Sequence, residues 1–206
     1  MKNYLFLILL TLLSCKKDKI IKKVVPKNEN LDLMYEVLNQ IIDENIKERD
    51  SSYYLNNSVF HIPSRSVYFK LNDVDDEESK PFGIYLKYDS IFSINDSVSY
   101  KDQSEQIVNF KLNKNRINQQ LNYISDEDLY RLREIKKSDF WEEFEKKYGN
   151  KCIESFSVPF FNIERNICVV EYSSSCGFLN AVGSILIYKK VNGKWVVLRR
   201  FGHWVS

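Results

Sequence analysis

The last third of the chain alternates apolar and polar residues, and this pattern restricts the fold more than any other feature of the sequence. Short turns divide the region into four predicted strands: CIESFSVPFF, NICVVEYSSSC, VGSILIYKK and KWVVLRRFGHWVS. The first turn spans residues 162–166. Consecutive strands joined by short connections pair antiparallel. The region from Cys152 onward is therefore predicted to form a four-strand antiparallel meander.

The turn between the last two strands is the clearest local signal. Asn192 and Gly193 both tolerate positive φ, which a two-residue type I′ hairpin turn requires. With the hairpin centred there, one face is expected to hold four apolar side chains, namely Ile185, Ile187, Trp195 and Val197.

Three cysteines lie in the meander, where one disulfide would leave one thiol free. If Glu164 lies at the centre of the first turn, Cys152 falls opposite Cys176, and a disulfide between them is geometrically possible. Cys168 and Cys176 lie on one extended strand, too far apart to bridge at roughly 3.3 Å per residue. We therefore expect Cys168 to be a small buried apolar residue. Because a one-residue change of register would separate Cys152 from Cys176, three reduced cysteines remain the alternative.

Three helices are predicted before the meander. Apolar residues recur at steps of three and four over residues 31–48, and Asn30 is a suitable N-cap. Ser125, followed by three acidic residues that favour a helix N-terminus, begins a helix that runs to about residue 136. Ser138 is expected to cap a third helix that ends at Gly149. The buried face of this last helix should hold four aromatic side chains, Phe140, Trp141, Phe144 and Tyr148.

Four further strands are predicted between the first two helices, at residues 58–62, 66–71, 82–88 and 106–112. Residues 96–105 are too polar for a core strand. The acidic segment 73–79, DVDDEES, lacks the spacing and the distal glutamate of a calcium-binding loop, so no metal site is predicted there. The expected fold class is α+β, with an N-terminal helix, an antiparallel sheet that ends in the meander, and two helices packed on it.

Composition and charge narrow the classes of function. The chain is 44% hydrophobic and 14% aromatic, which is typical of a folded domain. Its 30 basic and 28 acidic residues give a formal net charge of +2, so there is no electrostatic case for nucleic-acid binding. The sequence contains no dinucleotide, P-loop or zinc motif, and neither a cofactor nor a metal is predicted.

A hydrolase of the serine–histidine type is the enzymatic alternative. Its base would be His61 or His203, the only histidines in the chain. Candidate nucleophiles and acids are Ser155, Ser157, Ser174, Asp89 and Glu171. Because no G-x-S-x-G elbow or other nucleophile motif occurs, no catalytic residue is predicted.

A short apolar run begins the chain and is followed by a lysine-rich stretch. Residues 4–13, YLFLILLTLL, fall well short of the roughly 20 apolar residues that span a bilayer, and their layout is that of a secretory signal peptide. The run ends in Leu12-Leu13-Ser14-Cys15, which resembles the lipobox of bacterial lipoproteins. The resemblance implies that residues 1–14 are removed and that Cys15 is acylated, which anchors the chain to a lipid bilayer.

The predicted organisation is therefore a signal peptide over residues 1–14, a lipidated tether over residues 15–30 and one α+β globular domain over residues 31–206. In lipoproteins of Gram-negative bacteria, an aspartate just after the acylated cysteine tends to mark retention at the inner membrane. Lys16 occupies that place here, and we expect attachment to the outer membrane of the cell envelope.

The C-terminal region carries a second resemblance. The matching elements are SFSVPFFN, Cys176-Gly177, GSILIYKKVNGKW and a terminal HWVS. Over residues 125–206 the chain resembles an uncharacterised family of Gram-negative proteins that are often lipid-anchored. The likeness implies a module close to the nuclear-transport-factor-two-like fold and brings no known activity. Members of that family carry a second Cys-Gly where this chain has Asn180-Ala181, which weakens any disulfide carried over from them.

Taken together, these features predict a membrane-anchored lipoprotein with a non-catalytic binding or interaction module. Its partners would be the bilayer, through acylated Cys15, and an unidentified protein or small molecule, with no nucleic acid. The chain holds 13 tyrosines and 13 phenylalanines, which suit both a binding surface and a plain core. A serine–histidine hydrolase and a toxin-immunity or inhibitor lipoprotein are the alternatives.

Overall fold

A computed structural model describes residues 27–70, 83–135 and 139–206 of the chain. Residues 1–26, 71–82 and 136–138 lie outside the described part. The predicted signal peptide, Cys15, most of the tether and the acidic segment 73–79 fall within those ranges.

The described chain is α+β, as predicted. The helices are α1 (Lys27–Glu48), α2 (Ser51–Asn56), α3 (Ser97–Val108), α4 (Asp126–Arg133) and α5 (Phe140–Tyr148). The strands are β1 (Ser58–His61), β2 (Val67–Lys70), β3 (Ile84–Lys87), β4 (Cys152–Phe156), β5 (Phe160–Phe161), β6 (Ile167–Ser175), β7 (Ala181–Val191) and β8 (Lys194–Val205). Short 3₁₀ turns occupy Ile94–Asp96 and Lys114–Arg116.

The main sheet has the strand order β1-β4-β6-β7-β8, with β5 paired to β6. Its β4-β6-β7-β8 portion is the predicted antiparallel meander. The expectation of a wholly antiparallel sheet was wrong, because β1 pairs parallel to β4, from Ser58 beside Cys152 to His61 beside Ser155. The long connection between these two strands gives the chain room to return in the same direction. A second sheet consists of β2 and β3, which are also parallel.

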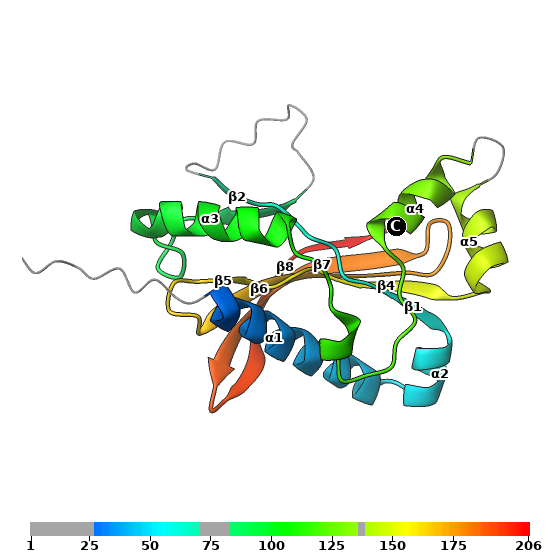
Figure 1. The fold of residues 1–206 in the computed structure, drawn as a ribbon, viewed down its shortest axis with the longest axis horizontal. Helices are drawn as coiled ribbons and strands as arrows, with labels where there is room; N and C mark the ends of the chain where they lie inside the picture. Colours follow the sequence, from blue (N-terminus) through cyan, green and yellow to red (C-terminus); the bar gives the residue numbers. More distant parts are fainter. Residues whose placement is uncertain (1–26, 71–82, 136–138) are drawn as a thin grey trace, which may run out of the picture.

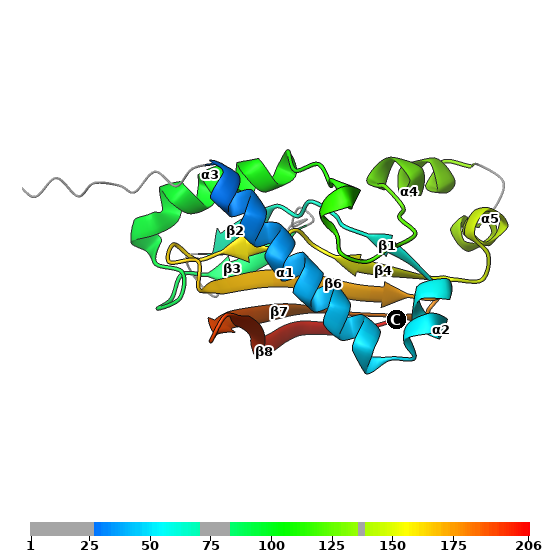
Figure 2. The same ribbon diagram turned by 60° about the horizontal axis from the view of Figure 1, so that its bottom comes forward.

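Helix α1 crosses one side of the main sheet, and α3 and α4 lie on the other (Figures 1 and 2). The predicted apolar stripe of α1 is buried at Met34, Val37, Leu38, Ile41, Ile42 and Ile46. Each fully buried aliphatic side chain of this kind contributes about 1.5–3 kcal/mol. The helix begins at Lys27, four residues before its predicted start, so Asn30 lies inside α1 and is not its N-cap.

Helix α3 was not predicted. Residues 96–105 were expected to be irregular and residues 106–112 to form a strand, but residues 97–108 are helical. Only Tyr100 and Ile107 of this helix are fully buried, so the apolar signal of its buried face is weak. A polar side chain of α3 also attaches the helix to strand β5. The Gln103 amide donates to the Phe161 carbonyl oxygen at 2.9 Å and accepts from the Phe161 N–H at 2.7 Å.

Helices α4 and α5 follow the predicted pattern with shifted ends. The Ser125 hydroxyl caps α4 by accepting from the Asp128 N–H, as expected, and the helix ends at Arg133. Asp139, and not Ser138, caps α5, because its carboxylate accepts from the Trp141 N–H. Gly149 ends α5 with a φ of 81°. The predicted aromatic face packs in a small second core with Val59, Ile124, Leu132 and Ile153.

The β7–β8 hairpin turns at Asn192 and Gly193, whose φ angles are 49° and 80°, as predicted. The expectation that Ile185, Ile187, Trp195 and Val197 share one face was wrong. Trp195 lies opposite Lys190 and Val197 opposite Tyr188, and opposed residues share a face of the sheet. Because side chains alternate along β7, Trp195 and Val197 lie on the face of Tyr188 and not on that of Ile185 and Ile187.

Candidate functional site

A histidine at the end of β1 joins the main sheet to α4. The His61 Nε2 lies 2.9 Å from Asp126 Oδ1, and its Nδ1 lies 3.3 Å from Ser155 Oγ. With a proton on Nε2 the ring donates to the carboxylate and accepts from the serine hydroxyl. Asp126 is the first residue of α4, and Ser155 is the partner of His61 in the neighbouring strand β4. Serine, imidazole and carboxylate are thus connected in the order that serine hydrolases use.

The sequence-based hypothesis named two of these three residues. His61 and Ser155 were candidates, but the expected acids were wrong. Asp89 instead accepts the backbone N–H groups of Ile91 and Phe92 in a turn. Glu171 forms an ion pair with Arg65, whose Nε lies 2.8 Å from the carboxylate.

The remaining candidates lie in other surroundings. The Ser157 hydroxyl accepts from the Glu171 N–H, and the Ser174 hydroxyl donates to the buried carboxylate of Glu154. His203 is exposed on β8. Asp126 was not predicted as a site residue, because acidic residues in the first turn of a helix are already expected from the helix dipole.

The surroundings of Ser155 differ from those of an activated nucleophile. Ser155 lies inside a strand, paired on one side with His61 in β1 and on the other with Ser173 in β6. Nucleophile elbows instead place the serine at a sharp turn where its oxygen is exposed. Ser155 and His61 are 9% and 5% exposed. The arrangement therefore has a structural role, because it fastens the first turn of α4 to the sheet.

This contact also sets the ionisation of Asp126. The hydrogen bond from His61 lowers the pKa of Asp126; partial burial opposes the effect, and the nearby charges of His61 and Arg65 lower the pKa further. A lowered folded-state pKa means that the charged form of the carboxylate stabilises the fold.

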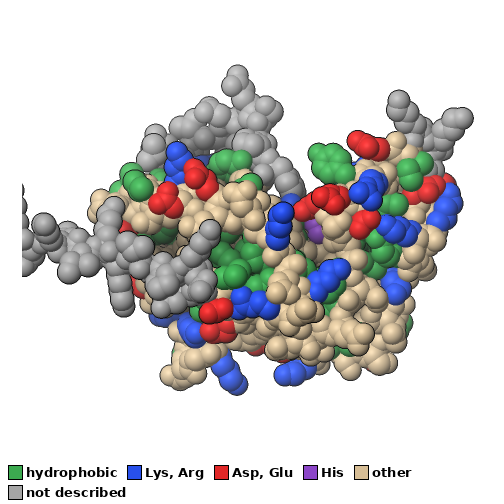
Figure 3. Space-filling view, viewed as in Figure 1, with side chains coloured by type: hydrophobic (Ala, Val, Ile, Leu, Met, Phe, Trp, Pro, Cys, Tyr) green, Lys and Arg blue, Asp and Glu red, His purple; other side chains and the backbone are tan. Residues whose placement is uncertain are grey.

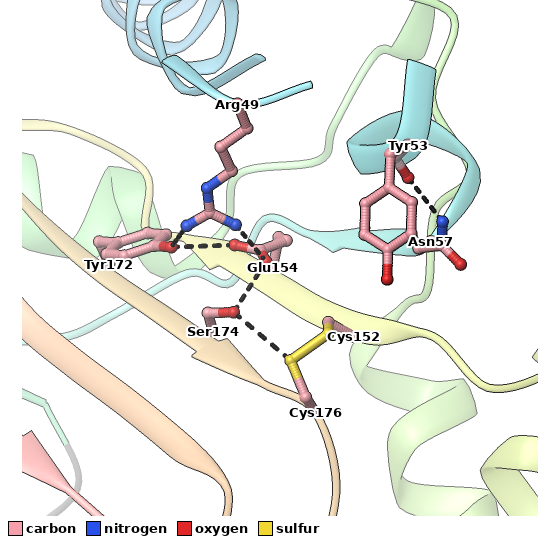
Figure 4. The surroundings of a disulfide bond; sticks show 8 residues. All are labelled: Arg49, Tyr53, Asn57, Cys152, Glu154, Tyr172, Ser174 and Cys176. Carbon is pink, nitrogen blue, oxygen red and sulfur yellow. Dashed lines mark hydrogen bonds and ion pairs between the residues drawn. A yellow bond between two sulfur atoms is a disulfide. The ribbon is translucent and has the colours of Figure 1, made fainter. Parts of the chain in front are cut away.

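A buried carboxylate lies beside the disulfide on the α1 side of the sheet (Figure 4). Glu154 is 1% exposed and accepts hydrogen bonds from the Ser174 hydroxyl at 2.7 Å and the Tyr172 hydroxyl at 3.0 Å. Arg49 adds an ion pair at 3.2 Å and also donates to the Tyr172 oxygen. Burial, with the charge of Glu154 as the next cause, raises the pKa of Tyr172 to about 12. These hydrogen bonds and the ion pair compensate for the burial of the Glu154 charge. The cluster therefore holds the end of α1 to the sheet, and its carboxylate is already occupied by protein donors.

The disulfide itself joins Cys152 and Cys176, the pair that the expected register allowed. Glu154 pairs with Ser174 in the ladder, so the cysteines two residues outward on each strand face each other. Cys168 is free and completely buried, as expected, and burial raises the pKa of its thiol.

A groove of 670 Å³ lies between α3 and β2. Half of its described lining residues are aromatic or aliphatic, namely Val67, Tyr68, Phe69, Tyr88, Tyr100 and Val108. The Phe69 ring is stacked between those of Tyr88, at 4.6 Å between centroids, and Tyr100, at 5.2 Å. Lys101 and Glu105 of α3 also line the groove, together with hydroxyl and amide groups.

The strand edge that faces this groove retains hydrogen-bonding capacity. Ser66 accepts from the Ile84 N–H, so Ser66 and Tyr68 point their backbone groups toward β3, and Val67 and Phe69 point theirs toward α3. The Val67 N–H donates to the Ser104 hydroxyl at 3.1 Å. Within the described residues the Phe69 N–H has no such partner. The groove thus combines an aromatic surface with a directed backbone donor.

A second groove, of 730 Å³, lies between the beginning of α1 and α3. Leu31, Met34 and Phe110 contribute its apolar lining. It has no stacked aromatic surface, and it is situated where the described chain begins, so we consider the α3–β2 groove the better candidate.

Neither clusters of metal ligands nor similarity to known proteins points to a further site. The described ranges contain no group of three His, Cys, Asp or Glu side chains arranged to hold a metal ion. Among the described helices, none has the length and apolar character needed to span a bilayer. No protein-family model, no curated protein and no solved structure matches the chain. The resemblance of residues 125–206 to a lipid-anchored family therefore stays a prediction.

Replacing His61 with alanine tests the attachment of α4. Because the Asp126 pKa is lowered in the folded protein, its contribution to stability is present above its ordinary pKa, near 3.8, and is lost as the pH falls through the folded value. In His61→Ala this loss should shrink, so urea unfolding between about pH 5 and about pH 3 should give a shallower decline than in the wild type. The cost near neutral pH should be about 1–3 kcal/mol.

The matched control is His203→Ala, which removes an exposed histidine. Its pH profile should run parallel to that of the wild type. Parallel profiles for His61→Ala and the wild type would contradict the role assigned to this contact.

Proposed function

We propose that this protein is a lipid-anchored envelope protein whose folded body binds a ligand without catalysing a reaction. The anchor rests on the lipobox resemblance of residues 12–15 and on the short apolar run before them. Attachment to the outer membrane rests on Lys16. The binding role rests on the α3–β2 groove.

The groove has the properties of a small-ligand site. Its volume of 670 Å³ lies within the usual range of about 300–1,000 Å³ for such sites. Aromatic and aliphatic residues make up half of its described lining, and the other half carries hydroxyl, amide and charged groups that can give specificity. Phe69 cannot easily move, because it is packed against Tyr88, Phe92, Tyr100 and Phe160. A stacked platform of this kind favours a ligand with a flat or apolar surface.

A pair of substitutions on one helix tests the groove. Val108 and Val98 are both exposed on α3, at 53% and 63%, but only Val108 lines the groove. Val108→Trp should fill the space and reduce co-purifying ligand by at least about tenfold, whereas Val98→Trp should leave the ligand in place. Native mass spectrometry of protein isolated from cell envelopes would detect the ligand. The binding role would be contradicted if no form carried a ligand, or if Val108→Trp kept it.

A serine hydrolase is the second candidate function, and the Ser155–His61–Asp126 chain is the observation in its favour. The strand position and burial of Ser155 weigh against it, and neither groove is lined by any of the three residues. A fluorophosphonate probe, which labels activated serines, separates the two functions. We expect no labelling that depends on Ser155. Labelling that is lost in Ser155→Ala and kept in Ser173→Ala would overturn the non-catalytic proposal.

A further inference from the structure

Strand β8 is the last strand of the main sheet and, among the strands that the structure describes, pairs only with β7 (Figure 2). It is 12 residues long, about twice the usual strand length. Ala181 and Ser206 exchange both of their backbone hydrogen bonds, so the next residue inward on β8, Val205, directs its N–H and C=O away from β7. An edge of this kind is a template for a further strand.

One position on this edge is already paired in the manner of a strand. The Gln40 side chain of α1 accepts from the Trp195 N–H at 2.8 Å and donates to the Trp195 carbonyl oxygen at 2.6 Å. The amide thereby imitates one residue of a neighbouring strand. No comparable side chain pairs with the backbone of residues 196–205 within the described part of the chain.

The same hairpin exposes an unusual amount of apolar surface. Seven of its large apolar side chains and two of the adjoining β6–β7 turn, Phe178 and Leu179, are between 39% and 75% exposed. The seven are Val182, Val191, Val196, Val197, Leu198, Trp204 and Val205. Single exposed apolar residues are ordinary, but neighbouring ones mark an interaction surface: Val182 lies opposite Val205, and Val196, Val197 and Leu198 are consecutive.

Trp204 is held in a defined position within this group. It lies opposite Gly183 of β7, and a Cβ atom added to that glycine would overlap the indole ring. The ring therefore packs directly on the backbone of β7. Tryptophan, with tyrosine and arginine, is enriched among the residues that contribute most of the binding energy of an interface.

The basic charge of the β7–β8 hairpin favours an acidic partner. Residues 181–206 contain five basic residues and no acidic residue; the basic ones are Lys189, Lys190, Lys194, Arg199 and Arg200. Of these, only Lys190 forms an ion pair among the described residues, with Glu36 of α1. An acidic partner would be attracted, whereas a second copy would bring basic edge against basic edge.

From these observations we propose that β8 docks an extended acidic segment of another protein, rich in apolar residues, as an additional strand. Val196, Val197 and Leu198 are consecutive and all about half exposed, so they point to both faces of the sheet. A strand paired along the edge covers both faces, which a flat bilayer surface does not. Backbone pairing supplies affinity, and alternating side chains supply specificity. This surface is separate from the α3–β2 groove and does not depend on the function proposed for it.

Basic residues and bulges on an edge also protect a sheet from aggregation. On β8 they have both consequences. Arg199 and Arg200 disfavour self-pairing, and the same charges favour a strand that carries glutamate or aspartate.

The test uses a synthetic peptide of about twelve residues that alternates glutamate and valine. The full-length chain, with Cys15→Ser to prevent acylation, should bind it with a dissociation constant in the micromolar range, and amide NMR signals of residues 196–205 should shift. Two control peptides should bind at least about tenfold more weakly. One replaces glutamate with lysine, and the other is N-methylated at four central residues, which blocks strand pairing on both of its edges.

Matched charge reversals complete the design. Arg200→Glu should weaken binding of the acidic peptide by about fivefold or more at low salt. Arg131→Glu, on the exposed side of α4, should leave binding unchanged. The inference would be overturned by equal binding of the N-methylated peptide, by no binding, or by self-association of the protein through β8. It would equally be overturned if only vesicles of anionic phosphatidylglycerol, and not the peptide, bound in an Arg200-dependent manner.

Discussion

The packing of α1 across the main sheet is the contact on which the rest of the molecule depends. Its buried stripe belongs to the same apolar core as residues of β6 and β7, including Cys168, Val170, Leu186 and Tyr188. Polar side chains of α1 also form hydrogen bonds with residues that are distant in the sequence. Trp195 of β8 donates its indole N–H to Glu36, and Asn39 binds the backbone at Arg116 and Asn118. One helix near the start of the described chain thus orders both the C-terminal strand and the connection between α3 and α4.

With α1 on one side, the two faces of the sheet differ in character. The α1 side holds the buried Glu154 and the free, buried Cys168, together with the disulfide, whose Cys152 is partly buried and whose Cys176 is exposed. The opposite side carries α3, the small β2–β3 sheet and α4, which combine apolar packing with side-chain hydrogen bonds to the sheet from Gln103 and Asp126. In the view of Figure 3, apolar, acidic and basic side chains are intermixed over this part of the surface, with a histidine visible among them.

Local sequence patterns were sufficient for the parts of the fold that local forces determine. The meander, the Asn192-Gly193 turn, the Ser125 cap and the buried stripe of α1 all follow from spacing and turn chemistry. The Cys152–Cys176 pairing followed from centring one short turn on Glu164. These features need no knowledge of distant residues.

The features that were not predicted depend on partners far away in the chain. Helix α3 is attached through Gln103 to Phe161, and Asp126 meets His61 across 65 positions. The parallel pairing of β1 with β4 likewise brings together segments about ninety residues apart. In each case a polar or short segment gains its structure from a tertiary contact that outweighs its local preference.

The proposed anchor places this folded body beside a membrane, held by an acylated residue 15. Intact mass spectrometry of the protein isolated from cells tests that claim most directly. We predict a chain that begins at Cys15 and carries the additional mass of fatty acyl groups, with residues 1–14 removed. An unmodified Cys15, or a chain that retains residues 1–14, would contradict it.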